Sequence, residues 1–594
     1  MGVPRLFPWL VRKFPSRVLS FTQGEQIMKN FSHLYLDANG LLHGAAQQVF
    51  NYGAAKNFLN PFVNLTFEEK KEQVFQIFFE HLIEICYMIR PTKTVYIAID
   101  GPAPLAKQAQ QRQRRFVASM NRKKEQEETT DQTLFDSNSI TPGTELMHEL
   151  TQYIYFAIRN EMTNSYLLKD VAVIFSPVTV PGEGEHKIMD YIRQTKAETR
   201  KDKHCFFGPD GDLIMLTLAT NLERMYLFRE NIRDQGGYDL LDMGGVRNDL
   251  LNVIYLEDHM IRSFDDSTFD FIVQGFFVGN DFLPKIQMFE FLEDGLEKSI
   301  EAYHQSSHGG KTNFITENGK VKLRGFCKFV AKLASHEREL LINQVVNQDK
   351  RRDEEDEKFK NKTLAECIQQ DNKGRLFFDY LHYRHRYYTE KCKFSVSEMN
   401  QKIQELCHDY LKTFIWVFEY YVSGNQSWDW AFRFHYPPLM EDFAYYLTTL
   451  TQTDFDEIYT FEMGTPTVPF VQLLGVLPRS SSYLLPPSYQ KLMTDKDSPL
   501  AKYYPEEFEI DYEGKAKEYQ GVALLPFVHQ PDIQKAYLQM KNCCVDDNLS
   551  YHRNELSKTP VLFLNNPVKM FNFTSKFGTV ERTNVEKIVL RDKE

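Results

Sequence analysis

The fold of this chain is decided by an apolar strand and the acidic turn that follows it. The strand is Asp170-Val171-Ala172-Val173-Ile174-Phe175-Ser176, and the turn is Gly182-Glu183-Gly184-Glu185-His186-Lys187. A second apolar run, His204-Cys205-Phe206-Phe207, leads into Pro209-Asp210-Gly211-Asp212 in the same way. Such runs are typical of strands that a parallel sheet buries on both faces. Because carboxylates at neighbouring strand ends repel one another, the pattern indicates a binding site for divalent metal ions.

Outward from this stretch, strands and helices alternate through the first half of the chain. Residues 34–36 lead into Asp37, residues 94–99 lead into Asp100, and residues 225–228 form a further short strand. Helical periodicity covers residues 68–89 and the stretch after about Ala103. This order predicts an α/β fold with an open, mostly parallel sheet flanked by helices. Ligands of such sheets bind beyond the carboxyl ends of the strands, where we expect these acids to converge.

A chain of 594 residues exceeds one ordinary core, so we expect it to divide. We place an N-terminal domain with the acidic site at residues 1–345, a charged linker at 346–365, a second region at 366–560 and a tail at 561–594. The second region is predicted to be largely helical to about Tyr421 and irregular beyond it. We expect it to pack against the first domain and complete its pocket, and we expect the tail to be poorly packed.

Composition excludes several classes of protein. Apolar residues make up 42% of the chain, which excludes wholesale disorder, and no run of apolar residues is long enough to span a membrane. The eight cysteines lack the paired spacing of zinc sites and indicate reduced thiols, so we expect an intracellular protein, in the cytoplasm rather than the nucleus. The net charge of −11 hides a basic run from Lys107 to Lys124 without any acid, a footprint for phosphate.

The acids favour catalysis over a purely structural role. One Asp after a strand is more often a helix cap than a metal ligand. Here the pattern recurs at Asp37, Asp100, the two acidic turns and Asp281, which interrupts the apolar segment Phe277-Val278-Gly279-Asn280-Asp281-Phe282-Leu283-Pro284. A lone carboxylate there would be costly unless it were paired or bound to a metal. Phosphoryl chemistry with two metal ions requires such a set of oxygen ligands.

A basic helix face follows Asp100 directly. The members of this face are Lys107, Gln111, Arg114 and Arg115, which helical spacing places on one side. Their guanidinium groups and amide suit a terminal phosphate. In isolation a solvated basic face would be the better interpretation, but the position beside the acidic pocket favours phosphate. Lys187 is an ordinary surface lysine or a cation that steadies a reacting oxygen. His43 is a structural residue or a ring that stacks on a base.

These residues belong to a longer set of motifs that resembles the XRN family of 5′→3′ exoribonucleases. The set occurs in the family's order over roughly residues 1–540 and comprises Met1-Gly2-Val3-Pro4, Leu36-Asp37-Ala38-Asn39-Gly40, Ile99-Asp100-Gly101-Pro102-Ala103-Pro104, Gln110-Gln111-Arg112-Gln113-Arg114-Arg115-Phe116, Ile140-Thr141-Pro142-Gly143-Thr144-Glu145, residues 182–187, Asp212-Leu213-Ile214-Met215-Leu216, residues 279–284, Ser427-Trp428-Asp429-Trp430, His435-Tyr436-Pro437-Pro438 and Gly521-Val522-Ala523-Leu524-Leu525-Pro526-Phe527.

The resemblance implies a PIN or flap-nuclease-like core that hydrolyses 5′-monophosphorylated single-stranded RNA to nucleoside 5′-monophosphates. It implies two Mg²⁺ ions, with Mn²⁺ as a substitute, and a monomeric protein. The metal ligands carry over to Asp37, Asp100, Glu183, Glu185, Asp210, Asp212 and Asp281, and Lys187 joins them as a catalytic residue. Substrate binding carries over to Lys107, Gln111, Arg114, Arg115, Asn39 and the stacking pair His43 and Tyr519.

The chain departs from the family's pattern at a few positions. Tyr519 stands where the family usually has Trp, so we expect stacking with less area. Pro209, Gly211 and Lys285 also differ, although every acidic and basic position is present. Three alternatives remain open: a flap endonuclease that cuts internally, an inactive RNA-binding scaffold and a phosphatase without nuclease activity.

Overall fold

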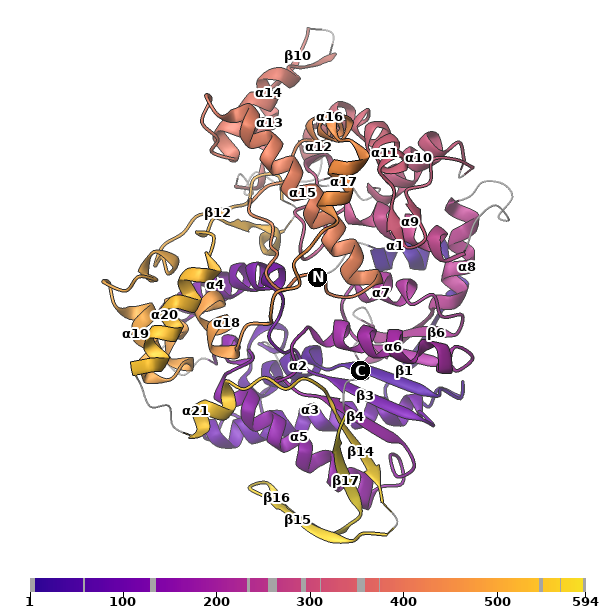
Figure 1. Ribbon diagram of the computed structural model, residues 1–594, viewed down its shortest axis with the longest axis vertical. Helices are drawn as coiled ribbons and strands as arrows, with labels where there is room; N and C mark the ends of the chain where they lie inside the picture. Colours follow the sequence, from indigo (N-terminus) through magenta and orange to yellow (C-terminus); the bar gives the residue numbers. More distant parts are fainter. Residues whose placement is uncertain are drawn as a thin grey trace.

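The computed structural model places a nine-stranded mixed sheet at the centre of the molecule (Figure 1). It describes residues 6–56, 59–128, 135–231, 236–254, 264–289, 295–309, 311–349, 358–372, 374–515, 517–543, 548–566 and 568–590. In order across the sheet, the strands are β1 (Val18–Thr22), β7 (Gly237–Asp242), β6 (Met225–Asn231), β5 (His204–Phe207), β2 (His33–Asp37), β3 (Thr94–Ala98), β4 (Ala172–Ser176), β14 (Val561–Asn565) and β17 (Val585–Val589).

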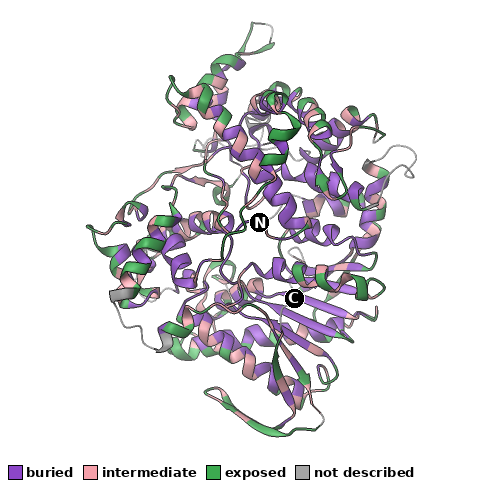
Figure 2. Ribbon diagram, viewed as in Figure 1, coloured by how far each residue is buried: buried purple, intermediate pink, exposed green. Residues whose placement is uncertain are grey.

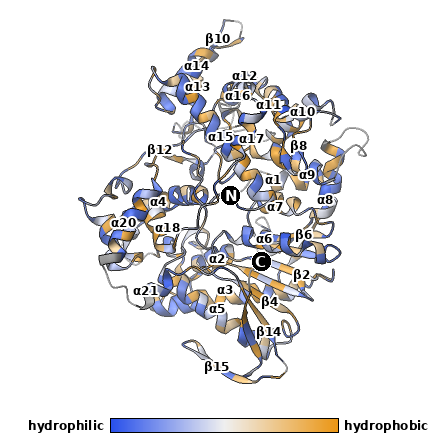
Figure 3. Ribbon diagram, in the orientation of Figure 1, coloured by the Kyte–Doolittle hydropathy of each residue, from blue (hydrophilic) through white to orange (hydrophobic). Residues whose placement is uncertain are grey.

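The parallel centre of the sheet confirms the predicted α/β core. β6, β5, β2, β3 and β4 pair in parallel, whereas β1, β7, β14 and β17 pair antiparallel at the two margins. The central strands are buried (Figure 2), and apolar residues gather on them (Figure 3). Side chains alternate between two cores, since Leu34 and Leu36 lie in one and Tyr35 in the other. The long apolar runs of the sequence therefore reflect burial on both faces.

Helices cover both faces of this sheet. One core contains side chains of α2 (Asn39–Phe50), α3 (Phe67–Ile89) and α5 (Glu145–Asn164). The other contains side chains of α1 (Leu6–Lys13), α6 (Gly184–Thr199), α7 (Leu213–Ala219), α8 (Met243–Ile254) and α9 (Phe264–Phe276). β2, β4 and β5 lead into α2, α6 and α7, which pack on the sheet. Because β2, β3, β4 and β5 run parallel, their carboxyl ends lie at one edge.

The second half of the chain is largely helical and continues one of these cores, as expected. Its buried centre is α15 (Met399–Val422), which packs with α7 and α9. Around it lie α10 (Gly295–Ser307), α11 (Leu323–Ala334), α12 (Glu337–Asp349), α13 (Lys362–Ala365), α14 (Tyr380–Arg386), α16 (Met440–Thr449) and α17 (Gln452–Ile458). The exact domain limits stay predictions, and residues 350–357 in the predicted linker lie outside the described part of the chain.

Helix α4 (Leu105–Glu128) extends from the end of β3 toward a third, smaller core (Figure 1). Phe116 of α4 packs there with α18 (Pro469–Val476), α19 (Pro487–Thr494) and α20 (Gln530–Cys543). Because later segments of the chain surround it, α4 links the sheet edge to the second region. No helix in the described part of the chain has the length and apolar character needed to cross a membrane.

The expectation of a poorly packed C-terminal tail is corrected by the sheet itself. β14 pairs with the free edge of β4, and β17 pairs with β14. Val561 and Phe563 are buried in the same core as α5. These strands are short and leave Leu564, Ile588 and Val589 exposed, so their place in the sheet depends on pairing with the edge of β4, which their local sequence does not record. Between them lies a hairpin of β15 (Phe571–Ser575) and β16 (Gly578–Thr583).

Candidate active site

Acids from separate elements converge at the carboxyl edge of the sheet. Asp37 ends β2, Asp100 follows β3, and Glu185 lies in the first turn of α6. Carboxylate oxygens of these three residues lie within 4.8 Å of one another. The backbone N–H of Gly184 donates to Oδ1 of Asp100 at 2.7 Å, so the start of α6 holds one of the acids. The convergence predicted from the strand order is therefore present.

Two glycines allow this close approach. A Cβ atom at Gly184 would lie 2.6 Å from Oδ1 of Asp37, and one at Gly101 would lie 1.8 Å from the carbonyl oxygen of Val180. The N–H of Gly101 donates to the carbonyl of Gly182 at 2.9 Å, which ties the acidic turn to the loop after β3. A side chain at either glycine would push the carboxylates apart. The glycine spacing of the motif is thus a requirement of the acidic cluster.

The buried acids of the cluster oppose one another's ionisation. Burial and then the charges of neighbouring acids raise the pKa values of Asp37 and Glu185 well above their usual range. Burial, with Asp210 and Asp281 adding to it, raises the pKa of Asp212 to about 6. Oδ1 of Asp37 and Oδ1 of Asp212 are buried and accept no hydrogen bond within the described part of the chain. Such a set of carboxylate oxygens suits hard divalent cations, so the residues fit a metal centre.

Lys107 of α4 reaches into this acidic cluster. Its Nζ lies 2.5 Å from Oε2 of Glu183, 3.0 Å from Oδ2 of Asp281 and 4.0 Å from Oε1 of Glu185. Burial works against its charge, yet the surrounding carboxylates raise the pKa of Lys107 well above its usual value. Burial would raise the pKa of Asp281, but Lys107 and Arg114 lower it. Lys107 therefore joins α4 to the acids by charge.

The other members of the basic face lie along the same side of α4. Gln111 is buried and accepts a hydrogen bond from Nε2 of Gln472 at 3.2 Å. The Arg115 guanidinium donates to Oγ1 of Thr141 at 2.8 and 3.2 Å. Arg114 lies 3.8 Å from Asp281, and its side chain is 44% exposed, so its fork is the one most open to a ligand. The predicted face is therefore continuous with the acidic pocket.

The residues predicted to contact substrate beside this face lie at different depths. Oδ1 of Asn39 accepts from the backbone N–H of Asp100 at 3.2 Å, so Asn39 positions the acid that follows β3. His43 is half-buried on α2, and burial together with Arg115 lowers its pKa to about 4, which keeps the ring neutral at pH 7. Tyr519 is 66% exposed. No ring contact within the described residues joins Tyr519 to His43, so this stacking pair stays a prediction.

Lys187 and Asp210 occupy the margins of the cluster. Nζ of Lys187 donates to the carbonyls of Ile99 and Pro177 at 2.7 and 2.9 Å, and burial lowers its pKa to about 7. Lys187 thus holds the ends of β3 and β4 together behind Asp100, and a direct catalytic role stays a prediction. Asp210 is exposed in the turn after β5, near enough to raise the pKa of Asp37.

The sequence did not indicate Tyr420 and His186 as parts of the site. The Tyr420 hydroxyl donates to Oε1 of Glu183 at 3.0 Å, across 237 residues of chain. Its ring stacks on His186, with centroids 3.5 Å apart and an angle of 9° between the planes. A ligand atom of His186 also lies within 4.8 Å of those of Glu183 and Glu185. The aromatic run around Trp416 reads as core in sequence, and no local spacing distinguishes the one tyrosine that bonds an acid.

Comparison with known proteins agrees with this geometry. A family model described as the XRN 5′-3′ exonuclease N-terminus matches residues 1–231, and one described as the Xrn1 helical domain matches residues 262–376 and 375–592. The chain is 30% identical to the human protein 5′-3′ exoribonuclease 1 over 91% of its own length, and 29% identical to 5′-3′ exoribonuclease 2 of Arabidopsis thaliana over 92%.

The chain spans 34% of the human relative and 68% of the Arabidopsis relative. It is also 26% identical to 5′-3′ exoribonuclease 1 of Saccharomyces cerevisiae, over 90% of this chain and 43% of that one. The first family region contains the parallel strands of the sheet, and the second contains the helical half that supplies Tyr420 to the acidic cluster. The chain therefore belongs to the XRN family of 5′→3′ exonucleases.

Proposed function

We propose that this protein is a 5′→3′ exoribonuclease that hydrolyses 5′-monophosphorylated single-stranded RNA to nucleoside 5′-monophosphates. The observation that carries the proposal is the junction of two charged surfaces, where Lys107 of the basic face lies 2.5 to 4.0 Å from three acids of the cluster. A phosphate bound along the basic face would leave the next phosphodiester beside the acids. The names of the relatives, all 5′-3′ exoribonucleases, support the same activity.

The basic face would hold the terminal phosphate. Arg114 is open enough to form a bidentate contact, and Arg115 and Gln111 are already oriented by Thr141 and Gln472. A triphosphate or a cap would exceed the space that suits one phosphate group, so such ends should resist hydrolysis. The neutral ring of His43 and the exposed ring of Tyr519 would stack on the first bases. Because stacking requires unpaired bases, duplex RNA would have to melt before entry.

The acids would hold the metal ions, which we propose to be two Mg²⁺: Asp37, Asp100, Glu183, Glu185, Asp210, Asp212 and Asp281. When bound, such ions lower the pKa of water and stabilise the departing oxygen. Asn39 and Gly184 hold Asp100 in place, and Tyr420 holds Glu183. Binding the first nucleotide by its 5′-phosphate fixes which phosphodiester is cut, so the enzyme would remove nucleotides one at a time.

The test uses one RNA sequence with three different 5′ ends. The protein is incubated with Mg²⁺ and RNA that carries a 5′-monophosphate, a 5′-triphosphate or a 5′-hydroxyl. We expect mononucleotides from the monophosphate substrate and at least tenfold less from the other two, given the worth of charge-assisted phosphate contacts. Internal fragments would favour an endonuclease, and binding without products would favour a scaffold. Equal rates from all three ends would overturn the proposal.

A further inference from the structure

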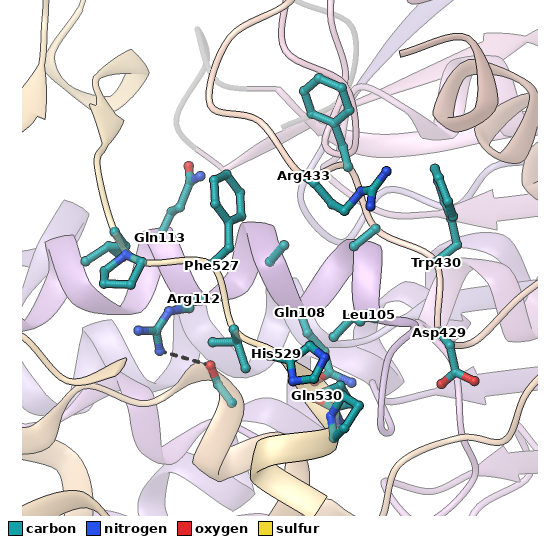
Figure 4. A pocket seen from close by; sticks show the side chains of 18 of the residues that line it. Leu105, Gln108, Arg112, Gln113, Asp429, Trp430, Arg433, Phe527, His529 and Gln530 are labelled. Carbon is teal, nitrogen blue, oxygen red and sulfur yellow. Dashed lines mark hydrogen bonds between the residues drawn. The ribbon is translucent and has the colours of Figure 1, made fainter. Parts of the chain in front are cut away.

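A groove of about 530 Å³ lies along α4, between this helix and two later segments of the chain (Figure 4). Leu105, Gln108, Ala109, Arg112 and Gln113 form its floor. Helical spacing places Leu105 and Arg112 on the side of α4 opposite Lys107 and Arg114. One wall is residues 429–435, and the other is residues 525–531. Each wall includes residues of a motif by which the second half resembles the family, namely Trp430, His435 and Phe527.

Flat aromatic side chains stand on both walls. The Phe527 ring stacks on His435, with centroids 4.4 Å apart and 29° between the planes, and Phe527 is 45% exposed. Trp430 lies on the other wall (Figure 4). Its Nε1 donates to Oγ1 of Thr413 at 3.1 Å, and Nζ of Lys412 lies 5.2 Å from the centre of its ring, which fixes the indole. Rings held by their neighbours lose little freedom when a ligand binds. The groove therefore offers preformed surfaces for a planar apolar ligand.

The groove also contains buried polar atoms that lack partners. Gln530 is 7% exposed, and neither its amide nitrogen nor its amide oxygen forms a hydrogen bond within the described part of the chain. Nδ1 of His435 and Nε of Arg112 are likewise buried and unpaired there. Unpaired buried amides are costly, and native proteins keep them where a ligand or water satisfies them. A primary amide offers a donor and an acceptor side by side.

The two arginines that line the groove already contact other groups of the protein. Arg112 donates to the carbonyl of Gly475 at 3.0 Å and to the carbonyl of Tyr503, and it lies over the Phe116 ring. Arg433 holds Asp409 through two bonds of 2.7 and 2.6 Å. The exposed acid Asp429 also lies on the rim. A phosphate would therefore find less attraction here than on the opposite face of α4, and a neutral planar ligand fits better.

We propose that this groove binds an unpaired nucleobase outside the catalytic pocket. Phe527 would supply the stacking surface, Trp430 would form the opposite wall, and Gln530 would bond the polar edge of the base. The base would belong to single-stranded RNA or to a free nucleotide. RNA as its source rests on the proposed function, whereas binding of a free nucleotide does not. The groove would add affinity for the body of a strand without reading its 5′ end.

The test compares nucleobase binding by groove variants in EDTA, where no hydrolysis occurs. The probes are a fluorescent single-stranded RNA with a 5′-hydroxyl end and, separately, AMP. We expect Phe527→Ala to weaken RNA binding roughly tenfold through the loss of one stacked base, and Gln530→Leu to weaken it by roughly three- to tenfold through the loss of hydrogen bonds to the base. The control Tyr551→Ala removes a ring that is 61% exposed on α21 (Asn548–Arg553) and should bind as wild type does. A matching loss for AMP would assign the site to free nucleotides as well, and unchanged AMP binding would assign it to the strand.

A second readout separates this proposal from the catalytic one. Hydrolysis of a 5′-monophosphorylated dinucleotide requires only the catalytic pocket, so Phe527→Ala should hydrolyse it at the wild-type rate. If wild type fails to hydrolyse it, the proposed function fails while the EDTA experiment still decides the groove. Thermal unfolding checks that both variants fold. The nucleobase site would be overturned if both folded variants bound both probes with wild-type affinity. It would also be overturned if the wild-type protein bound neither RNA nor AMP.

Discussion

The two faces of α4 carry the same kinds of residue and use them differently. Lys107 and Arg112 are both buried cations, but Lys107 contacts carboxylates whereas Arg112 contacts backbone carbonyls. Contacts to acids are charge interactions that an incoming phosphate or metal ion can replace, while contacts to the backbone are part of the fold. The comparison teaches that the partner of a basic residue, more than its burial, indicates whether it binds a ligand.

The largest effect should come from removing an acid of the cluster. Glu185→Gln deletes a charge that lies among the proposed metal ligands, and we expect kcat to fall by about a thousandfold or more, since metal ions supply several kcal/mol to such reactions. Affinity for RNA in EDTA should persist, because the basic face remains. Single-turnover hydrolysis and calorimetric titration with Mg²⁺ measure the two effects.

Asp190→Asn is the matched control for this change. Asp190 lies on the same helix, α6, but is 56% exposed and pairs with Arg193. Its loss should leave both measurements unchanged. Equal effects of the two substitutions would show that the acidic cluster has no special part in the reaction.

Substitution of one arginine from each face tests most directly whether the two faces of α4 have different roles. Arg114→Ala should lower kcat/KM for 5′-monophosphorylated RNA by roughly 10- to 100-fold relative to 5′-hydroxyl RNA, with little change in stability. Arg112→Ala should instead lower the free energy of unfolding by about 2–4 kcal/mol, because two buried carbonyls lose their donor, and leave the preference for the 5′ end intact. Denaturant unfolding and substrate competition separate these outcomes. An Arg112 variant that lost the 5′ preference would contradict the division between the faces.

Tyr420 tests whether the helical half completes the acidic site. Tyr420→Phe removes the bond to Glu183 but keeps the ring against His186, and we expect Mg²⁺ affinity to fall roughly tenfold, as for other groups that orient metal ligands. Tyr410→Phe is the matched control, since Tyr410 is buried on the same helix and its hydroxyl forms no hydrogen bond within the described part of the chain. Indistinguishable titrations of the two variants would remove Tyr420 from the site.

The smallest effect should be a pH dependence of metal binding. With its pKa raised to about 6, Asp212 carries a proton below that pH and is ionised above it. A metal ion must displace this proton, so the apparent affinity for Mg²⁺ should fall by roughly fivefold between pH 6 and pH 5 and change little above pH 7. Titrations in buffers of different ionisation enthalpy would report the released proton. Affinity that rose as the pH fell would contradict the assignment.

The strands that decide the fold are also the parts that sequence predicts best. Apolar runs such as residues 171–175 indicate β4 because both faces of the sheet are buried, and the acids after them mark one edge. β14 escaped prediction because its place depends on the free edge of β4, almost 400 residues earlier along the chain. Tyr420 escaped for a similar reason, since its bond to Glu183 joins two halves of the chain and no local pattern records it.

The central claim is that the basic face of α4 and the acidic cluster together recognise the 5′ end of an RNA and cut beside it. The most direct measurement is a time course with a strand that carries a radioactive 5′-phosphate and a fluorescent group at its 3′ end. We expect the radioactive label to appear first, as a nucleoside 5′-monophosphate, while the 3′ label stays on strands that shorten from the 5′ end. Early release of short fragments that carry the 3′ label, with the 5′ label still on RNA, would contradict the account.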